Sequence, residues 1–267
     1  MKRCSIWLVV VSFWAVSAYA STINLLTAGS FAVLGGSTVT NTGFTVLTGY
    51  LGLSPGSSIT GFPPGTYSGV EHISDAVANQ AQIDATNAYG AAAGQAVTGT
   101  MTGIDLGGQT LDPGVYFFAN SAQLTGILTL DTLGDPNAVF VFQIGSSLTT
   151  ASASSVVFTD GVNPVLPVAN VFWQVKSSAT LGSTTDFAGN ILALSSITLD
   201  TGANITCGRA LAQTGAVTMD DNAVSIGGCE VPAGGGGGTP EPGTVPLLGT
   251  GLLALILYSW RSRKRVA

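Results

Sequence analysis

Charged residues are scarce in this chain, and histidine is almost absent. Only 8% of the 267 residues are Asp, Glu, Lys or Arg, and His72 is the one histidine. A hydrolase needs a placed acid, base or nucleophile with a partner group. His72 lies at the start of a predicted helix, and we expect it to have a surface or capping role. The protein is therefore predicted not to be an enzyme.

Basic residues are rarer still once the two ends of the chain are set aside. Lys176 and Arg209 are the only ones between Ser21 and Pro240, where there are roughly thirteen acidic residues. Such a body is a poor partner for nucleic acid. The pair Asp220-Asp221 could touch a calcium ion, but one turn does not supply six or more oxygen ligands. We expect neither a metal nor a cofactor.

An export signal occupies residues 1–20. Two basic residues precede an apolar run from Ile6 to Val16, and Ala18-Tyr19-Ala20 supplies small residues for a cleavage site. This order is typical of a signal peptide that is removed before Ser21. An uncleaved membrane anchor is the alternative. In either case the body of the protein is predicted to be exported.

The C-terminus carries a second signal, at residues 240–267. A glycine-rich linker at residues 233–239 precedes Pro240-Glu241-Pro242, an apolar stretch from Val245 to Trp260, and a basic tail. This three-part pattern resembles the PEP-CTERM sorting signal of bacteria that produce exopolysaccharide. The resemblance implies recognition by an exosortase and a secreted or cell-surface protein with a transient or stable transmembrane segment. A plain C-terminal membrane anchor is the alternative.

Five threonines recur in the middle of the chain at similar positions in a local pattern. They are Thr129, Thr149, Thr180, Thr198 and Thr218, and successive members are 20, 31, 18 and 20 residues apart. A near-fixed period with one long insertion is typical of a solenoid whose repeats stack as coils. Because side chains alternate along a strand, the threonines are predicted to form one outward column with about 4.8 Å between rungs.

Three kinds of strand fit into each coil of about 19 residues, which predicts a triangular β-helix over residues 21–232. One kind is apolar on both faces, as in Val171-Phe172-Trp173-Gln174-Val175, and must be covered on its outer side. The second kind carries the threonines. The third kind includes residues 155–159 and 203–206.

The cover is predicted to be a helix over residues 73–93. Ser74 is its possible N-cap, and Asp75 suits the first turn. Its apolar stripe is expected to comprise Val77, Ala81, Ala85 or Ala88, and Ala92. Residues 22–70 also alternate like coil strands, so the first coils precede the helix and the others follow it. A helix that caps another part of the protein is the alternative.

Two cysteines remain after the export signal, which contains Cys4, is removed. Cys207 and Cys229 are 22 residues apart, close to one coil plus two residues, and could meet on adjacent coils. Because an exported protein enters an oxidising compartment, a disulfide between them is the favoured interpretation. A free thiol is the alternative.

Several stretches of the body resemble the secreted ice-binding, or antifreeze, proteins of bacteria, fungi and algae. The resemblance covers residues 22–229 and is carried by 40–43, 61–65, 111–116, 134–140, 170–175, 189–193 and 208–212. It implies a mainly β fold, a right-handed discontinuous β-helix, with one long α-helix along one face and a flat second face that binds ice. Some members carry Thr-Ala/Gly-x-Thr/Asn on that face, a motif that Thr201-Gly202-Ala203-Asn204 matches.

These observations predict an extracellular ice-binding protein that inhibits ice growth or recrystallisation through a flat Thr/Ser/Ala-rich face. The five threonines, with Thr201 and Asn204, are the candidate ice-binding residues, and an ice crystal surface is the expected partner. Two faces compete, because the face with Asn204 and Thr206 lies one strand beyond the threonine column. An extracellular adhesin or matrix protein that binds exopolysaccharide is the alternative function.

Overall fold

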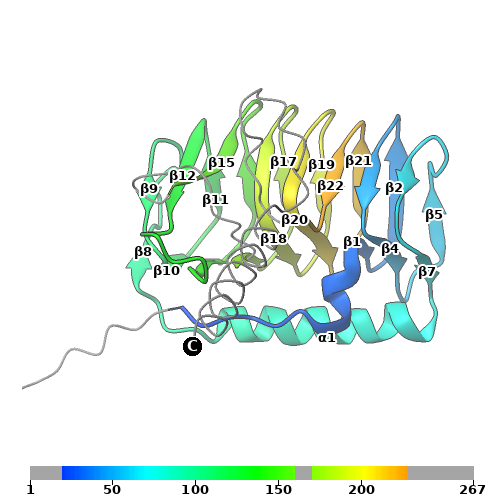
Figure 1. The fold of residues 1–267 in the computed structure, drawn as a ribbon, viewed down its shortest axis with the longest axis horizontal. Helices are drawn as coiled ribbons and strands as arrows, with labels where there is room; N and C mark the ends of the chain where they lie inside the picture. Colours follow the sequence, from blue (N-terminus) through cyan, green and yellow to red (C-terminus); the bar gives the residue numbers. More distant parts are fainter. Residues whose placement is uncertain (1–19, 160–169, 228–267) are drawn as a thin grey trace, which may run out of the picture. The chain divides into compact units, whose positions relative to one another are not determined.

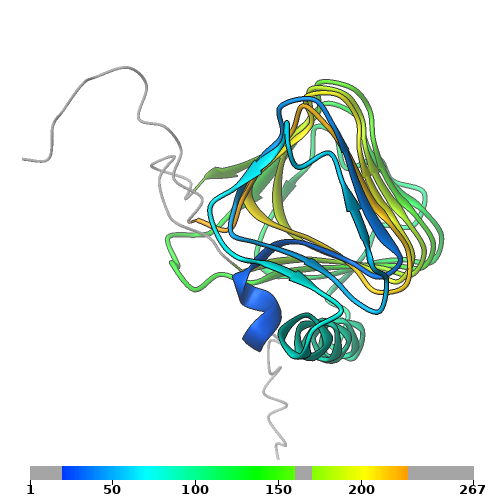
Figure 2. The same cartoon turned by 90° about the vertical axis from the view of Figure 1, so that its right-hand side faces the viewer.

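The computed structural model describes residues 20–159 and 170–227. The chain divides into two units, Met1–Glu230 and Val231–Ala267, and every described residue belongs to the first unit. Its strands pair in parallel and wind into stacked coils (Figure 1). Seen end-on, each coil has a triangular outline and a helix lies along one side (Figure 2). The predicted triangular β-helix is therefore correct, while the cleavage signal up to Tyr19, the linker and the C-terminal signal lie outside the described residues.

The first side of the triangle is the face that the helix covers. Its strands run in the spatial order β7 (Glu71–Ile73), β4 (Tyr50–Leu53), β1 (Phe31–Gly35), β20 (Asn204–Ala212), β18 (Asp186–Ala193), β16 (Val171–Val175), β13 (Phe140–Ile144), β10 (Gly114–Phe118) and β8 (Gly99–Thr100). In β13 and β16 all five residues are buried. This confirms the prediction that the fully apolar strands are covered on both faces.

The second side is a separate sheet of seven short strands. In spatial order these are β11 (Ala122–Leu124), β14 (Leu148–Thr150), β17 (Ala179–Leu181), β19 (Ile197–Leu199), β21 (Val217–Asp220), β2 (Thr38–Thr42) and β5 (Ser58–Thr60). Buried and partly exposed residues alternate along these strands, as in the pattern of β17 and β19. Such alternation is typical of a sheet with one face on the core and one on solvent.

The third side shares two long strands, β18 and β20, with the first side. It contains β9 (Thr110–Leu111), β12 (Ile127–Asp131), β15 (Ser155–Thr159), β22 (Ala223–Ser225), β3 (Val46–Thr48) and β6 (Thr66–Tyr67), together with the first residues of β18 and β20. β20 turns the corner at Gly208, and β18 turns it at the paired Gly189, whose φ is +110°. A Cβ there would lie 2.7 Å from the Trp173 indole nitrogen, so the corner requires glycine.

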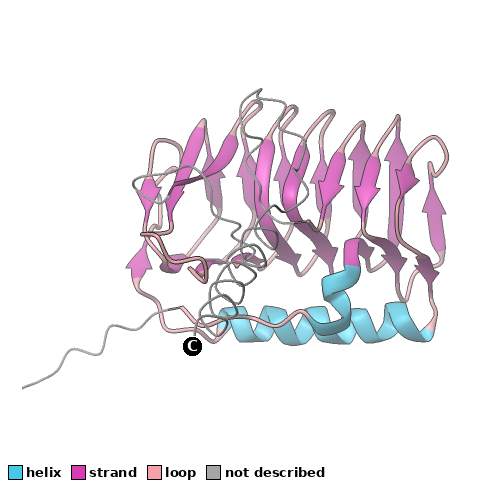
Figure 3. Cartoon of the chain, viewed as in Figure 1, coloured by secondary structure: helices cyan, strands magenta, loops and turns pink. Residues whose placement is uncertain are grey.

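The coils are discontinuous in sequence. β2 of the first coil pairs with β21 of the last, and β1 pairs with β20, so the N-terminal coils stack onto the C-terminal end of the solenoid. Helix α1 (Ala76–Ala93) then leads the chain back to the opposite end, where β8 begins the remaining coils (Figure 3). The prediction that the first coils precede the helix is confirmed.

Helix α1 begins at Ala76, three residues later than predicted, and its N-cap lies one residue later than predicted. The N-cap is Asp75, whose carboxylate accepts a hydrogen bond from Ala78 N, whereas Ser74 lies just outside with a φ of +50°. Ser74 was therefore the wrong cap. The buried stripe consists of alanines 78, 81, 85, 88 and 92 with Asp84, while Val77 is 38% exposed and was wrongly placed in the stripe. Small side chains let the helix approach the sheet closely.

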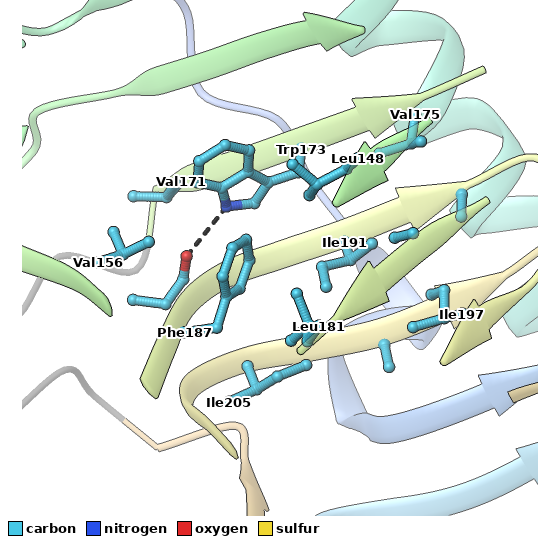
Figure 4. Close-up of a cluster of buried hydrophobic side chains, with 14 of the residues drawn as sticks. Leu148, Val156, Val171, Trp173, Val175, Leu181, Phe187, Ile191, Ile197 and Ile205 are labelled. Carbon is cyan, nitrogen blue, oxygen red and sulfur yellow. Dashed lines mark hydrogen bonds between the residues drawn. The ribbon is translucent and has the colours of Figure 1, made fainter. Parts of the chain in front are cut away.

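The interior of the triangle is filled by apolar side chains from all three sides (Figure 4). Trp173 is fully buried at its centre and stacks on Phe142 with a ring separation of 3.9 Å. Its indole nitrogen donates a hydrogen bond to the Ala188 carbonyl at 3.0 Å. The indole therefore fills the interior and also satisfies a backbone acceptor that water cannot reach.

Candidate functional site

The outward side chains of the seven-stranded sheet form two parallel columns, and we call this surface the threonine face. Lateral pairing places one residue of each strand in the first column, which contains Gln123, Thr149, Thr180, Thr198, Thr218, Thr40 and Thr60. The second column stands two residues earlier in the chain, at the start of each strand or directly before it, and contains Ser121, Ser147, Ser178, Ser196, Ala216, Thr38 and Ser58. The face is thus built from threonine, serine and alanine with one glutamine.

The inward neighbours of these residues explain why the hydroxyls face solvent. Leu148, Ala179, Ile197 and Val217 alternate with the columns and are at most 1% exposed. A shift of one residue in register would bury the hydroxyls and expose these apolar side chains. The hydrophobic core therefore fixes the orientation of both columns.

Hydrogen bonds along the serine column connect neighbouring coils. The hydroxyls of Ser121 and Ser147 are 3.0 Å apart, and Ser178 Oγ accepts a bond from Ser196 N at 3.3 Å. Ser196 Oγ in turn accepts from the backbone nitrogen of Ala216 at 3.2 Å. These bonds restrain the serine rotamers, and the β-branched threonines beside them have few rotamers of their own. The surface is consequently stiff as well as regular.

Every side chain in the two columns is uncharged. The nearest carboxylates in sequence belong to Asp200 and Asp220, just beyond the column residues at the ends of β19 and β21. Asp220 accepts a hydrogen bond from the hydroxyl of Thr201, which lies in the following turn of the neighbouring coil. The charges therefore stand at the edge of the threonine face rather than within it.

The structure brings together four of the five predicted threonines but excludes Thr129. Thr129 lies in β12 on the third side, between Thr110 of β9 and Val157 of β15. Its distance of 20 residues from Thr149 equals a coil length by coincidence, because Gln123 holds the column position in that coil. Including Thr129 in the column was wrong.

Two column residues were missed from the sequence, Thr40 and Thr60. They belong to the coils that precede α1, and Thr40 pairs laterally with Thr218 across the discontinuity in the chain. The alternation in residues 38–42 identifies a strand but does not reveal which coil it contacts. The alternation therefore predicts that Thr40 points outward, but nothing in the sequence predicts that Thr218 lies beside it.

Thr201 and Asn204 lie outside the two columns of the threonine face. Thr201 is exposed in the turn, and Asn204 starts β20 on the third side. The Asn204 amide donates to Asp186 at 3.3 Å, and its carbonyl oxygen accepts from Ala223 N at 2.8 Å. Asn204 therefore connects three coils of the third side.

The third side is less regular than the threonine face. Ile127, Val46 and Val157 are exposed there at 54%, 52% and 39%, beside the exposed carboxylate of Asp186. The pairing of β18 with β20 also contains a bulge between Phe187 and Ala188. This side thus combines apolar patches, a charge and an interrupted register.

Side chains able to do chemistry are few and dispersed in the part of the chain that the structure describes. Among residues 20–159 and 170–227, no three His, Cys, Asp or Glu side chains are grouped to hold a metal ion. His72 Nδ1 lies 2.7 Å from Oδ2 of Asp75, so His72 contacts the N-cap residue of α1 rather than capping the helix itself. Cys207 is buried in β20, but Cys229 lies outside the described residues.

The expected membrane segment is also outside the described residues. Across the described ranges, no helix has the length and apolarity that a membrane span requires. α1 itself is 18 residues long, but its polar outer surface and alanine stripe fit a helix packed on a sheet. Nothing described therefore bears on the segment from Val245 to Trp260.

Comparisons with known sequences agree on one family. The ice-binding-like family matches residues 33–225, and the PEP-CTERM protein-sorting motif matches residues 239–264. An ice-binding protein of Nostoc sp. (strain HG1) is 56% identical over 268 residues, which cover 99% of this chain and 97% of that protein. An ice-binding protein of Flavobacterium frigoris (strain PS1) is 33% identical and covers 76% of each chain.

Solved structures give the same result. The crystal structure of an ice-binding protein from an Antarctic biological consortium superposes with a TM-score of 0.74 at 48% identity, covering 81% of this chain and 96% of that one. The ice-binding protein of the Antarctic ascomycete Antarctomyces psychrotrophicus superposes with a TM-score of 0.72 at 40% identity. That match covers 78% of this chain and 99% of that structure.

Proposed function

Since this chain belongs to the ice-binding-like family, we propose that it adsorbs to ice through the threonine face and inhibits ice growth or recrystallisation. The observation that carries this proposal is the lateral register of seven strands, which aligns two columns of small hydroxyl-bearing side chains. No catalytic step is part of the proposal.

The physical requirements of an ice contact support this surface. The partner is a crystal plane without concavities, so a binding face must be flat, rigid and wide. Threonine presents a methyl group and a hydroxyl on a stiff side chain, so little rotamer entropy is lost on contact. Charged groups would hold strongly bound liquid-like water against the lattice, and both columns are uncharged.

The third side fits this task less well. Asp186 stands in the middle of its outward surface, and the bulge after Phe187 disturbs the strand spacing. Asn204, which the family motif suggested as an ice contact, uses both ends of its amide in bonds to Asp186 and Ala223. We therefore assign Thr201 and Asn204 to shaping the corner beside the threonine face rather than to contacting ice.

Export and sorting complete the proposal. The match to the sorting motif at residues 239–264 supports recognition by an exosortase and a final position outside the cell. In this proposal the apolar stretch within residues 240–267 would serve as a transient or stable membrane anchor. A disulfide between Cys207 and Cys229 would hold the chain that leaves the solenoid after β22. The same sorting motif favours a second candidate function, an adhesin that binds exopolysaccharide.

The test uses the chain from Ser21 to Gly238 and two matched double variants. Thr180→Tyr with Thr198→Tyr changes the threonine face, whereas Thr48→Tyr with Thr206→Tyr places the same side chains on exposed positions of the third side. We expect the parent and the third-side variant to shape ice and to show thermal hysteresis, and the threonine-face variant to lose both. The reverse pattern would move the contact to the third side. A parent chain that is inactive on ice but retains matrix polysaccharide would favour the adhesin.

A further inference from the structure

The residues after the predicted signal peptide form a strap across the apolar face. The strap, residues 21–30, ends in the short helix η1 (Leu26–Ser30) and runs beside α1 before the chain enters β1 (Figure 1). Ile23, Leu25 and Ala28 are buried in the same apolar cluster as the alanine stripe of α1. Helix α1 therefore covers the face together with the strap rather than alone.

Two charged side chains bind the two ends of η1. Asp84, which is 4% exposed in the buried stripe of α1, accepts a hydrogen bond from Thr27 N at 3.0 Å. Arg209 of β20 donates two bonds to the Gly29 carbonyl, at 2.9 and 2.6 Å. A carboxylate at the N–H end and a guanidinium at the carbonyl end match the polarity of the helix. The interior of the strap is thus fixed independently of its first residue.

The first residue of the strap has a binding partner of its own. Ser21 N donates to Gln95 Oε1 at 2.9 Å, and Gln95 Nε2 donates to Ser21 O at 2.7 Å, so the two residues pair reciprocally. Gln95 follows directly after the C-cap of α1, Gly94. The Gln143 side chain holds this end of the helix by donating to Ala92 O and Gln95 O, each at 2.9 Å.

We propose that this pairing is a binding site for the α-ammonium group that signal-peptide cleavage creates at Ser21. The proposal rests on the predicted cleavage before Ser21 and does not depend on the ice contact. In the precursor, Ser21 contributes a neutral amide. After cleavage the same nitrogen carries a positive charge, which strengthens its hydrogen bond to the Gln95 carbonyl oxygen. The charge also lies at the carbonyl end of α1, where the helix dipole favours cations.

Processing would then do more than release the protein from the membrane. The ammonium closes the free end of the strap over Ile23 and Leu25, whose apolar side chains otherwise depend on Asp84 and Arg209 for their position. An exported chain would have a more stable cover on its apolar face than its precursor. The site consequently couples removal of the signal to completion of the fold.

The test compares three forms of the otherwise complete chain. One begins at Ser21 with a free amine, the second has Ser21 acetylated, and the third begins at Ala18 and so retains three residues of the signal. Hydrogen exchange of the strap amides is measured in each form, together with Tm. We expect exchange of the strap to be about three- to tenfold faster in the second and third forms, because one charged contact at a helix end is lost.

Matched glutamine variants identify the partner of the ammonium. Gln95→Met should make the free and acetylated forms exchange at the same rate, whereas Gln109→Met, on a coil remote from the strap in sequence, should preserve their difference. Equal strap exchange in all three forms would overturn the proposal. N-terminal sequencing of the exported protein that finds a first residue other than Ser21 would overturn its premise. Neither result would alter the ice assay, which probes a different face.

Discussion

A pair of tyrosines at the centre of the threonine face provides the sharpest test of the ice contact. Thr180 and Thr198 are lateral neighbours and occupy the third and fourth of the seven rungs counted from Gln123. Their backbones lie in short strands whose inward neighbours are buried, so the substitutions change only the outward surface. Tyrosine also favours strands, and we expect the change in stability to stay within about 0.5 kcal/mol.

The size of the effect follows from the geometry of the column. Seven rungs at about 4.8 Å span about 29 Å from Gln123 to Thr60. Two protruding rings on central rungs leave an uninterrupted stretch of three rungs, from Thr218 to Thr60, or about 10 Å. Because contact free energy scales with contact area, about two thirds of the adsorption energy should be lost. Thr60→Tyr at the edge interrupts one rung and leaves about 24 Å intact.

Thermal hysteresis and inhibition of ice recrystallisation measure this difference. We expect the central pair to abolish both activities and the edge variant to keep most of the parent activity, at equal protein concentration. Far-ultraviolet circular dichroism and Tm serve as controls for folding. A central variant that is folded and as active as the parent would refute the assignment of the threonine face. Equal losses in the central and edge variants would refute the argument from uninterrupted length.

Three further predictions concern the scaffold. Trp173→Phe removes the donor to a buried backbone carbonyl and leaves a smaller ring in the interior, and should lower the free energy of unfolding by about 2–4 kcal/mol in guanidinium titrations. The hydrogen bond from Ala78 N and the contact with His72 hold the pKa of Asp75 below its usual value. Its stabilisation is thus present above about pH 4 and is lost as the pH falls through the lowered pKa, so Asp75→Asn should show a smaller acid-induced fall in Tm. Burial lowers the pKa of Arg209 to about 10, yet the group stays charged at neutral pH. Arg209→Met should destabilise the chain by about 2 kcal/mol and accelerate proteolysis within the strap. An unchanged cleavage rate would contradict the role of Arg209 in holding the strap.

Local patterns were sufficient to predict the class of fold. The alternation of apolar and hydroxyl residues, as at Thr180 and Thr198, depends only on the two-residue period of a strand. The fully apolar strand at residues 171–175 likewise required a cover, and the alanine-rich segment at residues 73–93 provided a candidate. These inferences held because side-chain direction within one element follows from its own backbone.

The sequence did not predict which residues make up the threonine face. Thr129 and Gln123 lie close together in one coil, and the sequence could not tell which of them continues the column, because both lie outward on short strands. Helix boundaries were similarly uncertain by a residue, since both Ser74 and Asp75 can cap a helix. The turns between the sides of the triangle decide to which side each strand belongs.

The residue pattern was therefore enough to predict a weakly charged β-helix with outward hydroxyls and one covering helix. The stacking of the coils places Thr40 and Thr60 in the column, because the pairing of β2 with β21 joins segments about 180 residues apart. It also places Thr129 on another side and makes the strap share the cover with α1. These cases have one cause. The direction of a side chain follows from the backbone of its own strand, whereas the strand beside it comes from a coil that is distant in sequence.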